Sequence, residues 1–388
     1  MKALPQSVKR KVLIIYKFMP QWRANFFSLL RDKLASQGIE LTLVYGRLKN
    51  EHATRGDEVD LDWARFIPNK TLRVGKIELY WQPCLSDVLK NDLIIVEQAN
   101  KLLINYFLMM LRLVTDKKIA FWGHGLNLLE HGNSYGNRLK RLYSTKCDWW
   151  FAYTEGVKER IASMGFPKEK VTVVQNAIDT SSLVKAYEMI SEGELSPIKS
   201  QLNIGNGPIG IYCGGMYKEK RLDFLLQSAA FIRDKVPEFE MIFLGAGPEE
   251  YKVRNISLQN KWIHYVGPKF GLDRVPYFRM ADVFLMPGAV GLAILDSFSM
   301  QTPLITTCSS HSPEIEYLRN GYNGVMTDNT LTDYVNTVVS VLGSENRMET
   351  LRNGCRQDAE KYTLEKMVDN FYKGILQSFT RQKHSIND

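Results

Sequence analysis

The sequence has little cysteine, and its cysteines are not spaced for pairing. There are five, an odd number, scattered at positions 84, 147, 213, 308 and 355, and no Cys-x-x-Cys spacing occurs. This pattern argues against a disulfide framework and a zinc cage, and it fits a reducing compartment. No other cluster of metal-ligating residues is visible in the sequence. We therefore expect a cytoplasmic protein with no metal and no cofactor.

Long hydrophobic runs are also missing. The longest, Leu102 to Val114, contains Asn105 and Arg112 and is too short to cross a bilayer. The chain opens with MKALPQSVKRK, and no long apolar region of the kind found in signal peptides follows it. RNP, zinc-finger and basic-zipper patterns are absent as well, so we expect no nucleic-acid partner.

Charges of both signs are present, but they are unevenly distributed. Residues 1–180 contain 28 Lys and Arg against 18 Asp and Glu, whereas residues 181–388 contain 22 against 24. The basic half predicts an anionic partner, and an anionic membrane surface or a phosphate-bearing acceptor fits best. Ordinary solubility charge is the alternative. The apolar helix expected at 100–112 either packs in the core or lies against lipid, with the protein peripheral on the inner face of the cytoplasmic membrane.

The first half alternates predicted strands and helices. KVLIIY at 11–16 predicts a buried strand, 24–37 an amphipathic helix, and ELTLVYG at 40–46 a second strand. No G-x-G-x-x-G follows the first strand, which argues against a dinucleotide; its loop instead contains Pro20, Trp22 and Arg23. A later strand at 119–122 runs directly into Gly-His-Gly. His124 therefore lies at a strand's carboxyl end, where a ligand role and local hydrogen bonding both remain open.

The second half repeats this pattern after a polar stretch at 181–207, which we interpret as a linker. PIGIYCGG predicts a strand followed by two glycines, and Lys220 comes next, at the start of a helix. A cation there would neutralise phosphate, although KEKR is equally typical of a solvated charge run.

VFLMPGAVGLAILDSFSMQTPLITT, at 283–307, predicts a strand, a glycine-containing loop, a helix and a second strand. Such loops bind anionic ligands in open α/β sheets. Asp296 lies on a helix with almost no polar face, so we expect a partly buried carboxylate that needs a partner. Ribose hydroxyls, a backbone group or a basic side chain would serve.

Five segments in order resemble the large family of retaining, nucleotide-sugar-dependent glycosyltransferases on the GT-B fold, the family 4 or "group 1" type. YTEGVKERIASMGFPKEKVTVVQNAID is similar to S-x-G-V-x-x-x-L…K-V-x-V-x-x-N-G-I-D, and GGMYKEKRLDFLLQSA to G-R-L-x-x-E-K-G-x-D-x-L-L-x-A. FLGAGP is similar to I-G-x-G-P. The stretch from ADVFLMPG to PLITT resembles the E-x7-E region, and PEIEYLRNGYNGV resembles P-E-x-I-x-x-G-x-N-G.

The resemblance implies an α/β protein with two Rossmann-like domains facing each other across a cleft. We expect an acceptor-binding domain at 1–180, the linker at 181–207 and a nucleotide-sugar-binding domain at 208–362. Residues 363–388 would form a C-terminal helix that crosses back to the first domain, followed by a tail.

The chain departs from the family pattern at two charged positions. The E-x7-E pair becomes Gly288 and Asp296, and the pyrophosphate-binding arginine of G-R-L-x-x-E-K becomes Gly215, while its lysine is kept as Lys220. The glycine-rich loop near the amino terminus is replaced by KFMPQWR. Arg23 is the candidate that would compensate for the arginine missing at 215.

The resemblance also implies roles for individual residues. Lys220 and the amides after Gly288–Gly291 would bind the pyrophosphate, Asp296 the ribose, and the loop at 266–271 the base. His124 would contact the donor sugar or orient the acceptor. The predicted catalytic residues are Lys220 and His124; the predicted donor-binding residues are Gly215, Gly245, Lys269, Phe270, Gly288, Ala289, Val290, Gly291, Leu292 and Asp296; the predicted acceptor-side residues are Pro20, Trp22 and Arg23.

The expected activity is transfer of a sugar from a nucleotide-diphosphate sugar to a saccharide, lipid-linked acceptor in bacterial-type surface polysaccharide assembly. It would proceed with retention and without a metal. A catalytically weak or inactive GT-B protein that binds a nucleotide sugar or a partner transferase is the alternative. A GT-B epimerase or phosphorylase is a third reading.

Overall fold

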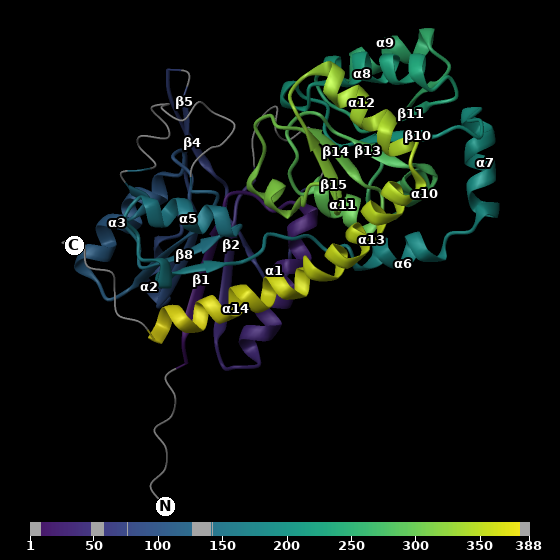
Figure 1. Ribbon diagram of the computed structural model, residues 1–388. Helices are drawn as coiled ribbons and strands as arrows, with labels where there is room; N and C mark the ends of the chain where they lie inside the picture. Colours follow the sequence, from purple (N-terminus) through teal and green to yellow (C-terminus); the bar gives the residue numbers. More distant parts are fainter. Residues whose placement is uncertain (1–8, 48–57, 76, 126–140, 142, 381–388) are drawn as a thin grey trace, which may run out of the picture. The chain divides into compact units, whose positions relative to one another are not determined.

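The computed structural model describes residues 9–47, 58–75, 77–125, 141 and 143–380. The chain forms two compact units: one contains Met1–Ile178 and Leu364–Asp388, and the other contains Asp179–Thr363. Each unit has a parallel sheet with helices packed against it, so both are Rossmann-like (Figure 1). This is the doubly wound architecture that the alternating pattern predicts.

The sheet of the first unit has seven strands in the order β3-β2-β1-β6-β7-β8-β9, all parallel. Its strands are β1 (Lys11–Tyr16), β2 (Glu40–Tyr45), β3 (Arg65–Phe66), β6 (Leu93–Glu97), β7 (Lys118–Gly123), β8 (Trp149–Ala152) and β9 (Val171–Val173). β4 (Lys70–Val74) and β5 (Ile77–Trp81) form a separate antiparallel hairpin. The helices are α1 (Gln21–Ala35), α2 (Leu85–Lys90), α3 (Leu103–Val114), α5 (Glu155–Ser163) and α14 (Leu364–Thr380).

The first sheet is buried on both faces, as its continuous apolar strands require. On one face α1 and the C-terminal helix α14 lie side by side (Figure 1). There Phe371 of α14 stacks on Phe151 of β8, with ring centroids 4.2 Å apart, and meets Trp122 edge-on. A second buried cluster contains side chains from α2, α3 and α5, including Val88, Leu108 and Ile161.

The sheet of the second unit has six parallel strands in the order β12-β11-β10-β13-β14-β15. They are β10 (Ile209–Cys213), β11 (Glu240–Leu244), β12 (Ile263–Gly267), β13 (Val283–Leu285), β14 (Leu304–Thr307) and β15 (Gly324–Thr327). The α-helices after β10 are α8 (Leu222–Lys235), α9 (Glu250–Gln259), α10 (Val275–Met280), α11 (Ala293–Ser299), α12 (Leu331–Leu342) and α13 (Glu345–Lys361). Three short 3-10 helices complete this part: η3 (Lys218–Lys220), η4 (Gly271–Arg274) and η5 (Pro313–Tyr317).

The expected linker at 181–207 is instead two helices that belong to the second unit, α6 (Ser181–Met189) and α7 (Glu192–Leu202). Leu183, Tyr187 and Leu195 are buried, and α6 and α7 both contact α10. A capping box between Ser191 and Glu194 starts α7. Leu183 and Tyr187, four positions apart, give α6 a core face, and Leu195 alone anchors α7. The polar composition of the segment conceals these few contacts.

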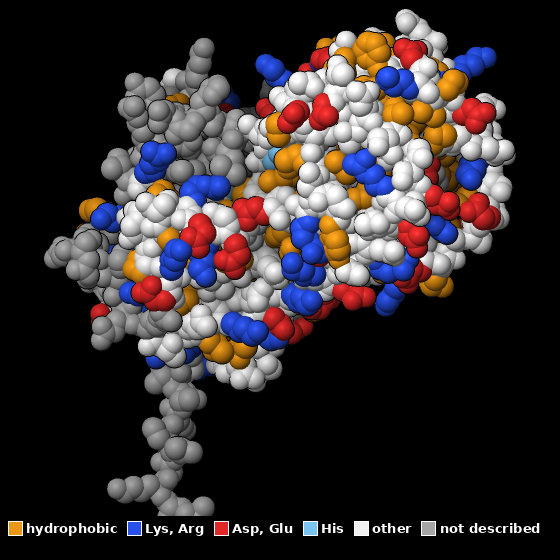
Figure 2. Space-filling model, viewed as in Figure 1, with side chains coloured by type: hydrophobic (Ala, Val, Ile, Leu, Met, Phe, Trp, Pro, Cys, Tyr) orange, Lys and Arg blue, Asp and Glu red, His pale blue; other side chains and the backbone are white. Residues whose placement is uncertain are grey.

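The surface of the second unit is mixed in charge. On the face shown in Figure 2, acidic and basic side chains are interspersed over this unit. Within the described residues, no helix is long and apolar enough to span a membrane.

Candidate active site

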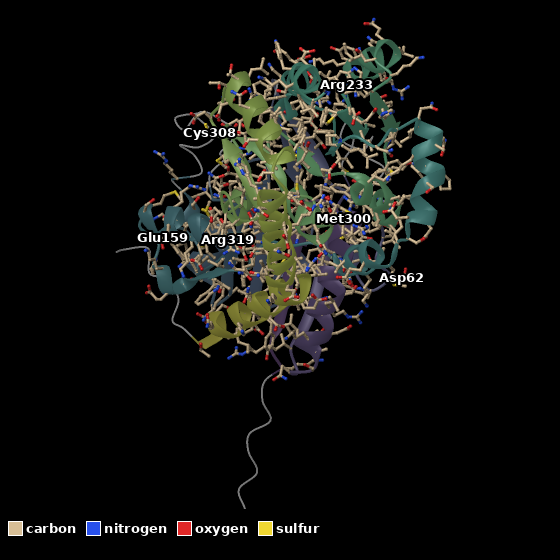
Figure 3. The ribbon with its side chains drawn as sticks, turned by 45° about the vertical axis from the view of Figure 1, so that its right-hand side comes forward. Asp62, Glu159, Arg233, Met300, Cys308 and Arg319 are labelled. Atoms are coloured by element: carbon tan, nitrogen blue, oxygen red, sulfur yellow. The ribbon has the colours of Figure 1, made fainter. Side chains whose placement is uncertain are left out.

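The strand order of the second sheet reverses between β10 and β13. Open α/β sheets bind ligands at the carboxyl ends of their strands at such a switch point. Figure 3 orients the carboxyl edge of this sheet: Met300 precedes the amino end of β14, and Cys308 follows its carboxyl end. The segments that leave the edge are Gly214-Gly215 after β10, Gly245 after β11, and residues 287–291 after β13.

The 287–291 loop is held against η3 by hydrogen bonds from both sides. The Ala289 N–H donates to the Glu219 carbonyl (2.8 Å), and the Lys220 Nζ donates to the Ala289 carbonyl (2.5 Å). Gly288 makes this approach possible. A Cβ there would lie 2.3–2.6 Å from backbone atoms of Glu219 and Lys220. The glycine is therefore required for packing of the loop.

A second set of contacts fixes the beginning of the same loop. The Pro287 carbonyl accepts hydrogen bonds from Arg221 Nη1 (3.3 Å), Thr307 Oγ1 (2.8 Å) and Ser309 Oγ (3.3 Å). Arg221 adopts a left-handed backbone conformation, with φ of 58°, at the start of α8. Its guanidinium also donates to Asn329 Oδ1 (2.6 Å), so it joins the ends of β13 and β14 to the segment after β15. A non-glycine residue in this conformation stores strain, which commonly marks functional segments.

The amides of the loop differ in their availability. Ala289 and Val290, both predicted to offer their amides to a donor, use them internally, because Val290 N–H donates to His311 Nδ1 (3.1 Å). Within the described part of the chain, the next three amides, of Gly291, Leu292 and Ala293, have no hydrogen-bond acceptor. The anion-binding capacity of this segment therefore lies at residues 291–293, where α11 begins.

Lys220 is buried beneath this loop, with 6% of its surface exposed. Its ammonium lies 3.6 Å from Met286 Sδ and donates to one carbonyl, and no ion pair involves it within the described ranges. Burial lowers the pKa of Lys220 to about 8, against a partial offset from the charge of Glu219. A buried cation without a carboxylate partner is poised to accept an external anion.

Asp296 is buried and partnered, as its apolar helix predicts. Its Oδ2 accepts a hydrogen bond from Arg274 Nη1 at 2.6 Å, and the Asp296 side chain is 8% exposed. Its Oδ1 is buried and has no partner in the described structure. Arg274 belongs to η4. It also lies beside the thiol of Cys213, and burial raises the pKa of that thiol to about 11. One carboxylate oxygen of Asp296 is thus paired with Arg274, and the other is a buried acceptor whose hydrogen-bonding capacity is unused in the described structure.

The remaining donor-side predictions lie along the same edge. Gly215 is exposed, and Tyr212 Oη donates to its carbonyl (2.8 Å). Gly245 has φ of 142°, and a Cβ there would lie 1.9 Å from the Gly214 carbonyl, so the loops after β10 and β11 touch. Lys269 is half-buried, and the Phe270 ring is 63% exposed just after β12. An exposed aromatic side chain at a strand end suits stacking of a nucleotide base.

The predicted residues of the first unit lie at two places, directly after β7 and at the start of α1. His124 is exposed directly after β7, with its ring centroid 4.6 Å from that of Tyr153. Trp22 is 39% exposed, whereas Pro20 is buried at the start of α1. His124 and Trp22 are therefore accessible on this unit, and their role remains a prediction.

Arg23 is a correction. It is fully buried, and its guanidinium donates to Asn176 Oδ1 (2.7 Å), the Ala177 carbonyl (3.3 Å) and Met367 Sδ (3.3 Å). Arg23 thus connects α1 to residues 176–177, near the point where the chain leaves the first unit, and to α14. A side chain so enclosed neither lines an open acceptor surface nor replaces the arginine missing at 215.

Three residues of the second unit were missed by sequence reasoning: Arg221, Arg274 and His311. Arg221 stands where the family pattern E-K-G has glycine. A glycine at that place suggests a left-handed backbone, so the arginine in its position was a signal that could have identified the residue. Arg274 and His311 lie in stretches without a recognisable pattern, 22 and 21 residues from their partners. Only the tertiary fold brings them to the edge.

No group of three or more His, Cys, Asp or Glu side chains suited to a metal ion occurs in the described residues. The edge brings together a buried ammonium, a clamped loop followed by amides without an acceptor among the described residues, a carboxylate bonded to Arg274 and an exposed aromatic ring. The ammonium and the amides suit an anion.

Comparison with known families matches both halves of the chain. A profile described as "Glycosyl transferases group 1" matches residues 207–344, and one described as "Glycosyltransferase Family 4" matches residues 25–182. Together they span about three quarters of the chain.

The individual relatives share less than a quarter of their aligned residues with this chain. An uncharacterized glycosyltransferase of Haemophilus influenzae is 22% identical over 257 residues, 63% of this chain and 67% of that protein. A GDP-mannose-dependent alpha-(1-6)-phosphatidylinositol monomannoside mannosyltransferase of Mycolicibacterium smegmatis is 23% identical over 163 residues, 39% of this chain and 42% of that protein. The Anabaena HepE protein, solved in complex with UDP, superposes with a TM-score of 0.68 at 12% identity, over 94% of this chain and 99% of that one.

Proposed function

The chain belongs to the group 1 glycosyltransferases of the GT-B fold, and from this premise we propose that it transfers a sugar from a nucleotide-diphosphate donor to a saccharide hydroxyl. Two observations at the β10–β13 switch point carry the proposal. Lys220 is buried beneath the 287–291 loop with no carboxylate partner in the described part of the chain, and the amides of residues 291–293 have no acceptor there. Both features favour a diphosphate at that place.

The proposed reaction breaks the bond between the anomeric carbon and the diphosphate oxygen, and a bond from the acceptor oxygen forms on the same face. The acceptor's proton passes to a donor phosphate oxygen, so no protein nucleophile is needed and configuration is retained. Negative charge grows on the departing diphosphate, where Lys220 and the 291–293 amides stabilise it. No metal takes part in this scheme.

Two further groups would orient the donor. The Oδ1 of Asp296, which has no partner among the described residues, would accept a ribose hydroxyl, while Arg274 holds the other carboxylate oxygen in place. The exposed ring of Phe270, beside Lys269, would stack on the base. His124 of the first unit would contact the transferred sugar or orient the acceptor.

The test is a screen of UDP-, GDP- and dTDP-sugars for release of the free nucleotide, with and without saccharide acceptors. Lys220→Met should reduce kcat/KM at least tenfold, about 1.4 kcal/mol of transition-state stabilisation. Lys218→Met is the matched control, because Lys218 is exposed on the same short helix. Equal activity in both variants would refute the site assignment.

A protein that binds a nucleotide sugar without efficient turnover is the second candidate. It is favoured by the absence of a carboxylate at Gly288 and of an arginine at Gly215. Slow donor hydrolysis separates the two, since a pure binder releases no nucleotide diphosphate. Interconversion of sugars without acceptor would indicate an epimerase, and a bound pyridoxal phosphate would indicate a phosphorylase.

We place the acceptor on a lipid at the cytoplasmic membrane surface, in surface-polysaccharide assembly, because α3 presents an apolar outer face. Met110, Leu113 and Val114 are 60–79% exposed, while Arg112 is turned inward to Asp148 at 2.8 Å. Lys117 Nζ donates to the carbonyl of Leu89 (2.6 Å), whose own side chain is 62% exposed, so a cation adjoins the apolar patch. Apolar side chains bordered by lysine suit anionic lipid.

Vesicle sedimentation tests this placement with phosphatidylglycerol against phosphatidylcholine vesicles. Serine at Met110, Leu113 and Val114 together should abolish binding to the anionic vesicles. Leu258→Ser is the control, because Leu258 is 86% exposed in the second unit. Binding that fails to weaken as salt rises would contradict the electrostatic part of the proposal.

A further inference from the structure

His311 occupies a buried position between two segments at the carboxyl edge of the second sheet. It is 6% exposed and lies four residues after the end of β14. Its Nδ1 accepts the Val290 N–H at 3.1 Å, and its Nε2 lies 2.7 Å from the Thr307 carbonyl. The ring therefore bridges the 287–291 loop and the end of β14.

These two contacts specify one form of the ring. A carbonyl oxygen only accepts hydrogen bonds, so Nε2 must carry a proton toward Thr307. An amide N–H only donates, so Nδ1 must present its lone pair toward Val290. Only the neutral imidazole with its proton on Nε2 satisfies both neighbours. A second proton, on Nδ1, would face the Val290 N–H and break the contact.

We propose that His311 is a positioning residue for the donor: in its neutral form it locks Val290, and through Val290 the free amides that follow, and its protonation releases them. The inference rests on the proposed function, because it takes the 291–293 amides as the diphosphate site. It adds a residue that does not touch the donor but sets the geometry of the groups that do.

The charges around the ring support a neutral histidine. Lys220 from η3 and Arg221 from the start of α8 both act on it electrostatically. The loop at 287–291 contains no ionisable side chain, and the other ionisable residues of His311's own segment are Cys308 and Glu314. Burial first, and then the two cations, lower the pKa of His311 below the ordinary 6.5, against a partial offset from the bond to Thr307. The hydrogen bond between Val290 and His311 is therefore kept at neutral pH and is lost as pH falls through the lowered pKa of His311.

Two amide substitutions separate the contacts of His311. In His311→Asn, the side-chain oxygen replaces Nδ1, so the Val290 contact is kept without a titratable group. In His311→Gln, the longer amide replaces Nε2, so the Thr307 contact is kept and the Val290 contact is lost. A merely structural histidine would be affected by both changes in a similar way.

The experiment measures the Kd of UDP and of GDP by calorimetry between about pH 5 and pH 8, in wild type and both variants. The asparagine variant is expected to bind as wild type does at pH 8 and to lose the acid weakening seen in wild type. The glutamine variant is expected to bind roughly tenfold more weakly throughout, the effect of about one hydrogen bond. The phosphate's own titration is common to all three proteins, so the comparison between them isolates the histidine.

The hydrogen-exchange rate of the Val290 amide measures its hydrogen bond to His311 without any nucleotide present. It should be slow in wild type and His311→Asn at neutral pH and fast in His311→Gln. Equal exchange in the two variants, or identical acid limbs in wild type and His311→Asn, would overturn the inference. If wild type binds neither UDP nor GDP and the donor screen finds no turnover of dTDP-sugars, the proposed function fails and the donor role falls with it. The exchange comparison still decides whether His311 holds the loop.

Discussion

Replacing Lys220 by methionine is expected to stabilise the unliganded protein and at the same time weaken donor binding. Burial lowers the pKa of Lys220 from 10.5 to about 8, so holding its ammonium protonated in the fold at pH 7 costs about 3 kcal/mol. Methionine keeps the unbranched stem and removes the charge. Loss of the hydrogen bond to the Ala289 carbonyl offsets about 1 kcal/mol, which leaves a net gain of about 2 kcal/mol.

The pH dependence of this gain has a definite sign. Below pH 8 the lysine is protonated in both the folded and the unfolded chain, and the full penalty is present. Between pH 8 and 10.5 the folded state releases the proton first, so wild type gains stability as pH rises. The advantage of the methionine variant should therefore shrink across that window. Donor affinity of wild type should also fall above pH 8, as the free protein loses the cation.

Native-state hydrogen exchange on β13 and β14 measures this stability within the second unit, and calorimetry with UDP and GDP measures binding. Lys218→Met controls for the loss of a positive charge. The reasoning is refuted if Lys220→Met is less stable than wild type at pH 7, or if its advantage is unchanged at about pH 10. Unchanged nucleotide affinity would separately remove Lys220 from the donor site.

Three further outcomes are expected. Gly288→Ala should destabilise the second unit by about 1–3 kcal/mol in urea unfolding, because its new Cβ would lie 2.3 Å from a backbone atom. Gly291→Ala is the control: its Cβ would lie 3.6 Å from the nearest atom, so the free energy of unfolding should change by less than about 0.5 kcal/mol. Arg274→Met should cost about 3–5 kcal/mol by leaving Asp296 buried and charged, and adding Asp296→Leu should restore most of that stability without restoring donor affinity, as a double-mutant cycle would show. Arg23→Met should lower the thermal stability of the first unit and leave the Kd for nucleoside diphosphate unchanged; a large change in that Kd would return Arg23 to the binding site.

Much of the fold followed from local pattern. The buried strand KVLIIY and the unit from Val283 to Thr307 are where their apolar runs and loop glycines place them. The segment at 181–207 was misread because its charged residues outnumber the three apolar side chains that anchor it. The short strands of the β4–β5 hairpin gave no pattern that was recognised.

One local feature of the candidate site was predictable from the sequence: the need of Asp296 for a partner followed from its apolar helix. The donor-binding roles given to Lys220 and the 287–291 loop remain predictions. The identity of the partner of Asp296 did not follow from the sequence, because Arg274 reaches Asp296 from another loop. The same limit explains Arg23: its position after the first strand suggested an open cleft, but α14, which covers it, comes from the far end of the chain.

The position of α14 affects the order in which the protein becomes folded during synthesis. Residues 179–363 are contiguous, so every residue of the second unit is synthesised before α14. The first unit must wait for Phe371 and its neighbours: until then Trp122 packs on Phe26 and Phe27 of α1, but Phe151 lacks its stacking partner. A premature stop codon after position 363 would therefore spare the later-made half and expose the earlier-made one to aggregation and degradation.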